Sequence, residues 1–131
     1  NFSKGKYAGT IDDSLKLKDC TITNAVRCVP PQNKPISEEI NNCNNFLKKT
    51  IEIHKNLKVI IALGLIAHKS IISALNLKQK LYKFKHGNKH KIDNLILIDS
   101  YHCSRYNTNT GRLNQEMFEK IFFEAKKELK I

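Results

Sequence analysis

The alternation of apolar and polar positions along the chain predicts three strands. Two short continuous apolar runs occur at 57–64 and 94–100, and the first of them ends in glycine. Such runs are typical of strands that are buried on both faces of a parallel sheet. The segment 15–26 instead alternates apolar and polar residues and contains several β-branched side chains, so it also predicts a strand.

Helical spacing of apolar residues predicts three helices between and after these strands. Ser37 has the character of an N-cap, and two glutamates follow it in the first turn, where the helix dipole favours anions. This first helix runs to about His54, and a second covers 65–76. A long third helix begins after Asn114, its predicted N-cap, and continues towards the end of the chain.

The order of these elements predicts one α/β domain over residues 1–131. Alternation of strands with helices indicates a parallel sheet that is covered on both faces. The basic segment that precedes the last strand is expected to hold a short strand around 81–85 and then a loop. In open parallel sheets, ligands bind beyond the carboxyl ends of the strands. The two unusual strand-end loops, 24–35 and 101–113, should therefore form one site at the same sheet edge.

The charge of the chain favours a polyanionic partner. The net charge is +11, and the window 53–92 holds nine Lys and four His with no acidic residue. This window is either a surface that faces phosphates, with nucleic acid as the first candidate, or a solvated basic face. No apolar run approaches eighteen residues, so the sequence predicts no membrane span.

The loop at 101–113 has the composition of a binding loop. His102 can donate to a phosphate or to a developing negative charge. Neutral donors surround it, and Arg105 and Arg112 supply two of the three arginine forks in the chain. The alternative is a long capped surface loop. Because structureless loops of this length are uncommon in small domains, we favour a functional role in phosphate contact.

Asn24 and the cysteines are the other candidates for chemistry. The Asn24 amide can read a base edge through its donor and acceptor, although satisfying backbone groups at a strand end is the commoner role. The four cysteines form no CxxC pair, and nothing indicates secretion, so we expect reduced thiols. Cys43 is either a small core residue of its helix or, with Cys28, part of a metal or cluster site. His54 and His68 fall on predicted helices and are interpreted as surface or packing residues.

Four motifs in order carry a family resemblance. ITNAVRCVPPQNKP, VIIALGLIAH, FKHGNKH and LIDSYHCSRYNTNTGRL resemble the prokaryotic uracil-DNA glycosylases with an iron–sulfur cluster. The resemblance covers nearly all of 15–130 and is strongest to the type 5 branch, with type 4 next. It implies a three-layer α/β/α sandwich with a central parallel sheet. It also implies base-excision repair, in which the enzyme flips a nucleotide and hydrolyses the glycosidic bond of uracil or another deaminated base.

The resemblance implies a role for each matching residue. Asn24 would read the Watson–Crick edge of uracil, and His102 would stabilise the departing uracil anion. Cys28 and Cys43 would be two of the four ligands of a 4Fe-4S cluster, whereas Cys20 and Cys103 match no ligand position. The remaining substrate-binding residues fall in the loop that grips DNA: Ser104, Arg105, Asn107 and Asn109.

The family's N-terminal features have no match in these residues. They are a Gly- and Pro-rich motif, an acidic residue that assists the attacking water, and the first two cluster cysteines. We therefore expect the C-terminal portion of such a fold, acting as a monomer on uracil-containing DNA in a prokaryotic cytoplasm. Two alternatives stay open: a non-catalytic basic module that binds nucleic acid, and a structural domain that binds a metal.

Overall fold

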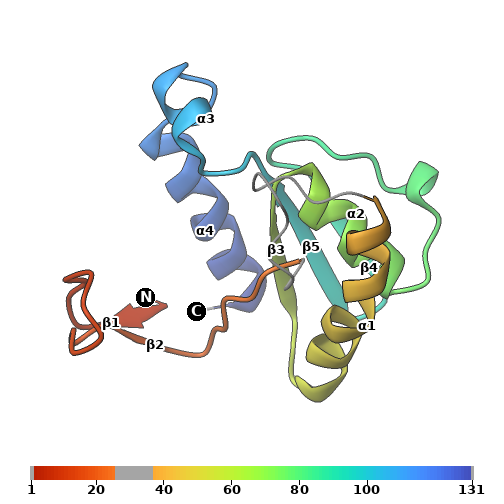
Figure 1. Cartoon of the computed structure of the whole chain (residues 1–131), viewed down its shortest axis with the longest axis horizontal. Helices are drawn as coiled ribbons and strands as arrows, with labels where there is room; N and C mark the ends of the chain where they lie inside the picture. Colours follow the sequence, from red (N-terminus) through yellow and green to blue (C-terminus); the bar gives the residue numbers. More distant parts are fainter. Residues whose placement is uncertain (1, 26–36, 131) are drawn as a thin grey trace.

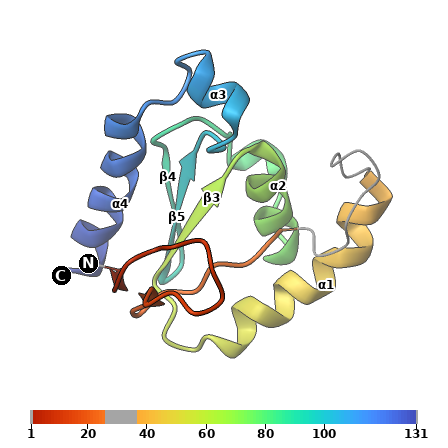
Figure 2. The ribbon, with the colours of Figure 1, turned by 60° about the vertical axis from the view of Figure 1, so that its left-hand side comes forward.

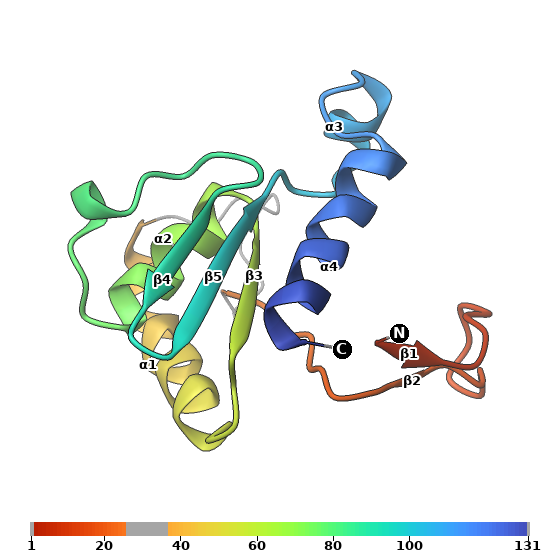
Figure 3. The same ribbon diagram turned by 180° about the vertical axis from the view of Figure 1, so that it is seen from behind.

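The fold centres on a three-stranded sheet in the order β3-β5-β4. The structure is a computed structural model that describes residues 2–25 and 37–130, without the side chains of 37–43. β3 (Val59–Leu63) runs parallel to β5 (Leu95–Ser100), and β4 (Lys89–Ile92) pairs with β5 in the antiparallel sense (Figure 3). The two apolar runs are therefore strands, as the sequence predicts, and the sheet is mixed because β4 reverses direction.

Helices cover both faces of this sheet, which confirms the predicted three layers. α1 (Ser37–Ile53) and α2 (Leu65–Ala74) lie on one side, and α4 (Gln115–Leu129) lies on the other (Figure 2). Because successive side chains of β5 point to opposite faces, each face has its own apolar cluster. Leu97 packs with α1 and α2, and Ile98 packs with α4, and both side chains are 0% exposed.

The start of α4 follows its predicted cap. The Asn114 side-chain oxygen accepts a hydrogen bond of 2.8 Å from the Met117 amide, which satisfies one of the free donors in the first turn. At the other end, Lys130 adopts a left-handed conformation with φ 58° and closes the helix. The inner face of α4 then presents Ile121 and Ala125 to the sheet.

The strand predicted at 15–26 is wrong in most of its length. Among its described residues, 15–25, β2 (Lys16–Leu17) is the only strand, and it pairs with β1 (Ser3–Lys4) in a separate two-stranded sheet beyond α4 (Figure 1). Asp19 follows with φ 53°, which interrupts an extended chain. Ile22 is 77% exposed, so the alternation of apolar and polar residues here does not correspond to a buried face of a sheet.

The strand predicted around 81–85 is also wrong. A short 3-10 helix, η2 (Gln79–Leu81), occupies the start of this segment, and the strand forms later as β4. β4 joins β5 through the two-residue turn Asp93-Asn94, in which Asp93 takes φ 51°. Its Lys-His-Lys-Ile sequence alternates exposed and more buried positions, and this period of two is hidden by its basic composition.

Candidate active site

The carboxyl end of β5 carries His102 against the first turn of α2. Gly64 sits between β3 and α2 with φ 99°, and its amide donates 2.8 Å to the Ser100 carbonyl. A Cβ on Gly64 would lie only 3.2 Å from the Cβ of His102. Glycine is therefore required here for its conformation and for the close approach of His102.

A cleft of ≈ 440 Å³ opens beside His102, and we call it the His102 cleft. It lies where the parallel strands β3 and β5 end, which is the edge that the sequence predicts for ligand binding. Among the described residues, its lining includes cations and no acidic side chain, so it is suited to an anionic ligand. The residues that line it are Gly64, Leu65, Phe84, Lys85, Tyr101, His102, Asn107 and Arg112.

Tyr101 forms an aromatic platform in this cleft. The His86 ring stacks on it with centroids 4.8 Å apart, and the Arg112 guanidinium lies 5.0 Å from the Tyr101 centroid. The Tyr101 amide donates 3.0 Å to Nδ1 of His86. Burial lowers the pKa of His86, and a backbone hydrogen bond at Met117 opposes part of that shift. A lowered pKa favours the neutral ring, which can accept the Tyr101 hydrogen bond.

The segment after His102 is folded rather than irregular. It contains α3 (Arg105–Asn109), which lies beyond the end of β5 (Figure 1). The Ser104 hydroxyl caps α3 by accepting 3.3 Å from the Asn107 amide. The Asn107 side chain donates 2.9 Å to the His102 carbonyl, and Leu113, only 2% exposed, donates its amide to the Asn107 carbonyl. These bonds give the loop a defined shape around His102.

The predicted site residues fall into two groups in the structure. His102 and Asn107 line the same cleft, with Arg112 beside them, and Arg105 and Asn109 lie exposed on α3 next to it. Asn24 is exposed and does not belong to the cleft lining. The structure therefore joins the residues of the last loop and leaves the role of Asn24 as a prediction.

The side chains of the two predicted cluster ligands, Cys28 and Cys43, are not among those that the structure describes. Cys28 falls outside the described residues, and Cys43 lies in α1 with its side chain outside them. The two cysteines with described side chains, Cys20 and Cys103, are both exposed and free. The Cys20 thiol donates 3.3 Å to the Phe2 carbonyl.

A buried group of three side chains near the cleft is not predicted by the sequence reasoning. Asp99 in β5 binds His68 of α2 and His90 of β4, and His68 and Asp99 are 1% and 0% exposed. The interpretation of His68 as a packing residue is correct for its burial but misses its partner. The available signal is an aspartate directly after the apolar run LILI, where a buried strand would otherwise continue.

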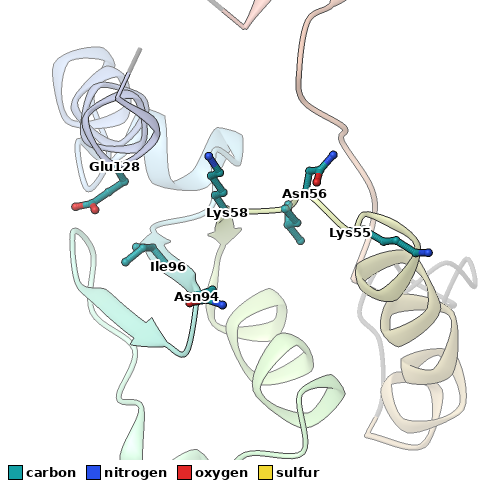
Figure 4. A pocket seen from close by; sticks show the side chains of 7 residues that line it. Lys55, Asn56, Lys58, Asn94, Ile96 and Glu128 are labelled. Atoms are coloured by element: carbon teal, nitrogen blue, oxygen red, sulfur yellow. The ribbon is translucent and has the colours of Figure 1, made fainter.

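A second concavity of ≈ 320 Å³ lies at the opposite, amino end of the parallel strands. Figure 4 shows that its side chains come from the α1–β3 connection, the β4–β5 turn, the start of β5 and the last part of α4. Lys58 and Glu128 bring both signs of charge to it. Its position and mixed charge fit an anionic ligand less well than the His102 cleft does.

Within 2–25 and 37–130, no helix has the length and apolar character of a membrane span.

Comparison with known proteins shows the family to which the chain belongs. The pattern of the uracil DNA glycosylase superfamily matches residues 4–126, so the chain belongs to this superfamily. A type-5 uracil-DNA glycosylase of Thermus thermophilus is 38% identical over 116 residues, which are 88% of this chain and 53% of that protein. A type-5 enzyme of Pyrobaculum aerophilum is 32% identical over 94% of this chain and 53% of its own length.

A type-4 uracil-DNA glycosylase of Sulfurisphaera tokodaii is also similar, at 32% identity over 82% of this chain and 51% of that protein. The chain thus spans about half the length of the curated relatives it matches. The fold agrees with the resemblance seen in the sequence motifs. So does the similarity first to type-5 and then to type-4 enzymes.

Proposed function

We propose that these residues form part of the catalytic domain of a uracil-DNA glycosylase, which hydrolyses the N-glycosidic bond of uracil in DNA during base-excision repair. The observation that carries the proposal is the place of His102, at the carboxyl end of β5 in a cleft whose described lining residues include cations and no acid. Membership of the superfamily supports the reaction class, and relatives named for uracil-DNA support the substrate.

His102 is the proposed catalytic residue. When the glycosidic bond breaks, its electron pair leaves with the base, and a donor aimed at the uracil oxygen stabilises that charge. The close approach of Gly64 and the Asn107 bond to the His102 carbonyl hold the backbone from which this exposed imidazole projects. A held backbone reduces the reorganisation that is needed to place the donor as the charge develops.

The cations of the cleft are proposed to bind the DNA backbone around the flipped nucleotide. Flipping moves a base out of the stack, and contacts to the neighbouring phosphates hold the strand in that form. Lys85 and Arg112 line the cleft, and Arg105 is exposed on the adjacent α3. Asn109 is likewise exposed there, whereas Ser104 and Asn107 also shape the loop through their own hydrogen bonds. Asn24 is proposed to read the uracil edge.

A 4Fe-4S cluster is proposed as the cofactor, with Cys28 and Cys43 as two of its four ligands. Thiolates are the donors that such clusters use, and relatives of types 4 and 5 support the assignment. Cys20 and Cys103 serve as matched controls because both are exposed and resemble no ligand position. Cys43→Ser is expected to remove iron and visible absorbance, whereas Cys20→Ser keeps both. Retention of the full iron content by Cys43→Ser and Cys28→Ser would contradict the cofactor.

Base release from a defined oligonucleotide tests the function. The full-length protein is incubated with uracil-containing DNA and with matched thymine-containing DNA, and alkali-labile sites are counted. His102→Ala is expected to lower the single-turnover rate by about 10²–10³-fold, the size of a lost oxyanion-type donor. His54→Ala is the control, because His54 is exposed and outside the cleft, and its rate should match the wild type.

The alternative of a non-catalytic nucleic-acid module predicts a different result in the same assay. The net charge of +11 is the observation that favours it. Such a module would bind both oligonucleotides with a steep dependence on salt and would release no base. That outcome with the full-length protein would refute the glycosylase. We further propose a monomer in a prokaryotic cytoplasm, which size-exclusion chromatography and cell fractionation can test.

A further inference from the structure

The buried side chains of Asp99 and His68 and the partly buried side chain of His90, here called the Asp99 network, join β5, α2 and β4. Nδ1 of His68 lies 2.6 Å from Oδ1 of Asp99, and Nε2 of His90 lies 2.8 Å from Oδ2. The Lys85 amide also donates to Oδ2, at 3.4 Å. Each carboxylate oxygen of Asp99 therefore has at least one donor, as a fully buried carboxylate requires.

The His68 ring places a proton in this network. Its Nε2 lies 2.6 Å from the Tyr82 carbonyl, which can only accept, so Nε2 must carry a hydrogen. The 2.6 Å contact between Nδ1 and the Asp99 carboxyl also needs a hydrogen between its two atoms. The pair thus holds one shared proton, whichever of the two atoms carries it. Every polar atom of this pair is satisfied while the proton stays there.

The same three residues are of types that bind metals, but their spacing favours hydrogen bonds. Their candidate ligand atoms lie within 4.8 Å of one another. Around a tetrahedral zinc with bonds of about 2.0–2.1 Å, neighbouring ligand atoms would be about 3.4 Å apart. The observed separations of 2.6 and 2.8 Å are shorter than that and match charge-assisted hydrogen bonds.

The network holds one wall of the cleft in place. His68 fixes the Tyr82 carbonyl, and the Asp99 side chain fixes the Lys85 amide. The Asp99 backbone completes the attachment, since its carbonyl accepts from Gly87 at 2.8 Å and its amide donates to Asn88 at 2.9 Å. The segment 82–88 is therefore bound at four points to one residue of β5 or to the histidine that it holds.

This segment supplies side chains to the site. Phe84 and Lys85 line the His102 cleft, and His86 stacks on Tyr101, the residue before His102. Phe84 also meets the His68 ring edge-on at 5.6 Å, which couples the cleft wall directly to the network. A change in the network would shift Lys85 and His86 relative to His102 without removing any group that lines the cleft.

We propose that Asp99, with His68 and His90, is a positioning network that sets the DNA-binding geometry of the His102 cleft through segment 82–88. The inference rests on the proposed function for its kinetic readout. It assigns no chemical step to these residues, because they act through Lys85 and His86. It also predicts that hydrogen bonding, and neither a metal nor the negative charge itself, is what the network needs.

Asp99→Asn against Asp99→Ala separates hydrogen bonding from charge. The asparagine amide NH₂ can donate to Nδ1 of His68, and its oxygen can accept from His90 and the Lys85 amide, so every bond of the network has a replacement. Alanine replaces none of them. At the edge of the network, His90→Gln keeps a donor near the position of Nε2, whereas His90→Leu removes it and fills a similar volume. The His90 pair is the safer test of folding, because its side chain is 11% exposed.

Steady-state kinetics of the full-length protein on uracil-containing DNA give the main readout. His90→Leu and Asp99→Ala are expected to raise KM by about tenfold, the effect of losing one charge-assisted contact between a displaced Lys85 and DNA, with a smaller change in kcat. Asp99→Asn and His90→Gln should keep KM within about threefold of wild type. Circular dichroism establishes that each variant is folded before its constants are compared. The proposal is overturned if folded His90→Leu leaves KM unchanged, or if Asp99→Asn is as impaired as Asp99→Ala.

Two further measurements do not depend on catalysis. Nitrogen NMR of labelled histidine in the wild type should show a hydrogen on Nε2 of His68 and a strong hydrogen bond at its Nδ1. Metal analysis should find the same zinc content in the wild type and in Asp99→Asn. A zinc ion that is present in the wild type and lost in Asp99→Asn would overturn this proposal in favour of a metal site. If the wild type releases no uracil, the proposed function fails, and the NMR result with the affinities of the variants for DNA still decides the network.

Discussion

A methyl group at position 64 is expected to disturb His102 without touching its chemistry. Gly64 has φ 99°, and an added Cβ would stand 3.2 Å from the Cβ of His102 and 3.6 Å from its Cδ2. Ordinary contacts of this kind lie between 3.4 and 4 Å. Gly64→Ala therefore imposes two separate costs, which are strain in its own backbone and a displacement of His102 by a few tenths of an ångström.

The two costs have different magnitudes and different readouts. A non-glycine residue in such a conformation costs about 1–3 kcal/mol of folding free energy. For domains of 150–250 residues, this corresponds to a fall in Tm of roughly 2–12 °C. A misplacement of about 1 Å in an active site can lower the rate about 100-fold, so a few tenths of an ångström predicts a loss of about three- to tenfold.

Gly9→Ala is the matched control for this experiment, because Gly9 lies outside the His102 cleft. Gly9 also has a positive φ, of 71°, but a Cβ added there would meet only the Tyr7 hydroxyl and ring, at ordinary distances of 3.8 and 4.0 Å. The Tm of thermal unfolding should therefore fall in both variants. The single-turnover rate of uracil release at saturating protein should fall further in Gly64→Ala. Equal rates in the two variants would refute the idea that Gly64 is needed for the close approach of His102.

Three further predictions concern stability. Asn114→Ala should lower the unfolding free energy by about 1 kcal/mol through loss of the α4 cap, and Asn114→Asp should not, as denaturant titration can show. Hydrogen bonds from Lys89 and Lys127 lower the pKa of Glu124 from 4.5 to about 2, so its contribution to stability is full above pH 4.5 and is lost as pH falls towards 2. In Glu124→Gln, the unfolding free energy should depend less on pH in that window. A dependence on pH equal to that of the wild type would contradict a role for the ion pairs. Ile72→Ala should cost about 2–5 kcal/mol, because Ile72 is 0% exposed in the core under α2.

Strong periodicity explains which elements could be predicted from the sequence. All five residues of β3 and the first four of β5 are apolar because both faces of these strands are covered, and the cap of α4 acts within one turn. The prediction of a strand at 81–85 in place of β4 is wrong because the exposed lysines of β4 mask its more buried alternate positions. The segment 15–26 has strand-like alternation, yet its neighbours in space leave Ile22 exposed, and no local pattern carries that information.

The candidate site divides in the same way. His102 and its loop could be predicted because polar residues at the end of a buried strand are unusual in themselves. The fold of that loop could not, since α3 depends on the bond from Asn107 back to the His102 carbonyl. The Asp99 network could not be predicted either. His68 and His90 lie 31 and 9 residues before Asp99 along the chain. Only the sheet register and the placement of α2 bring the three side chains together.

The alternation of β5 shows why the Asp99 network is better explained by geometry than by stability. Leu97 and Asp99 are two residues apart and both face α2, so an apolar residue at position 99 would continue the core. Replacing a buried ion pair by apolar residues is often neutral or stabilising by about 1–4 kcal/mol. Stability alone therefore does not favour a carboxyl at this position. A carboxyl with two separate oxygens can, however, fix α2, β4 and the Lys85 amide at defined distances. An apolar core cannot impose that directional arrangement on the wall of the His102 cleft.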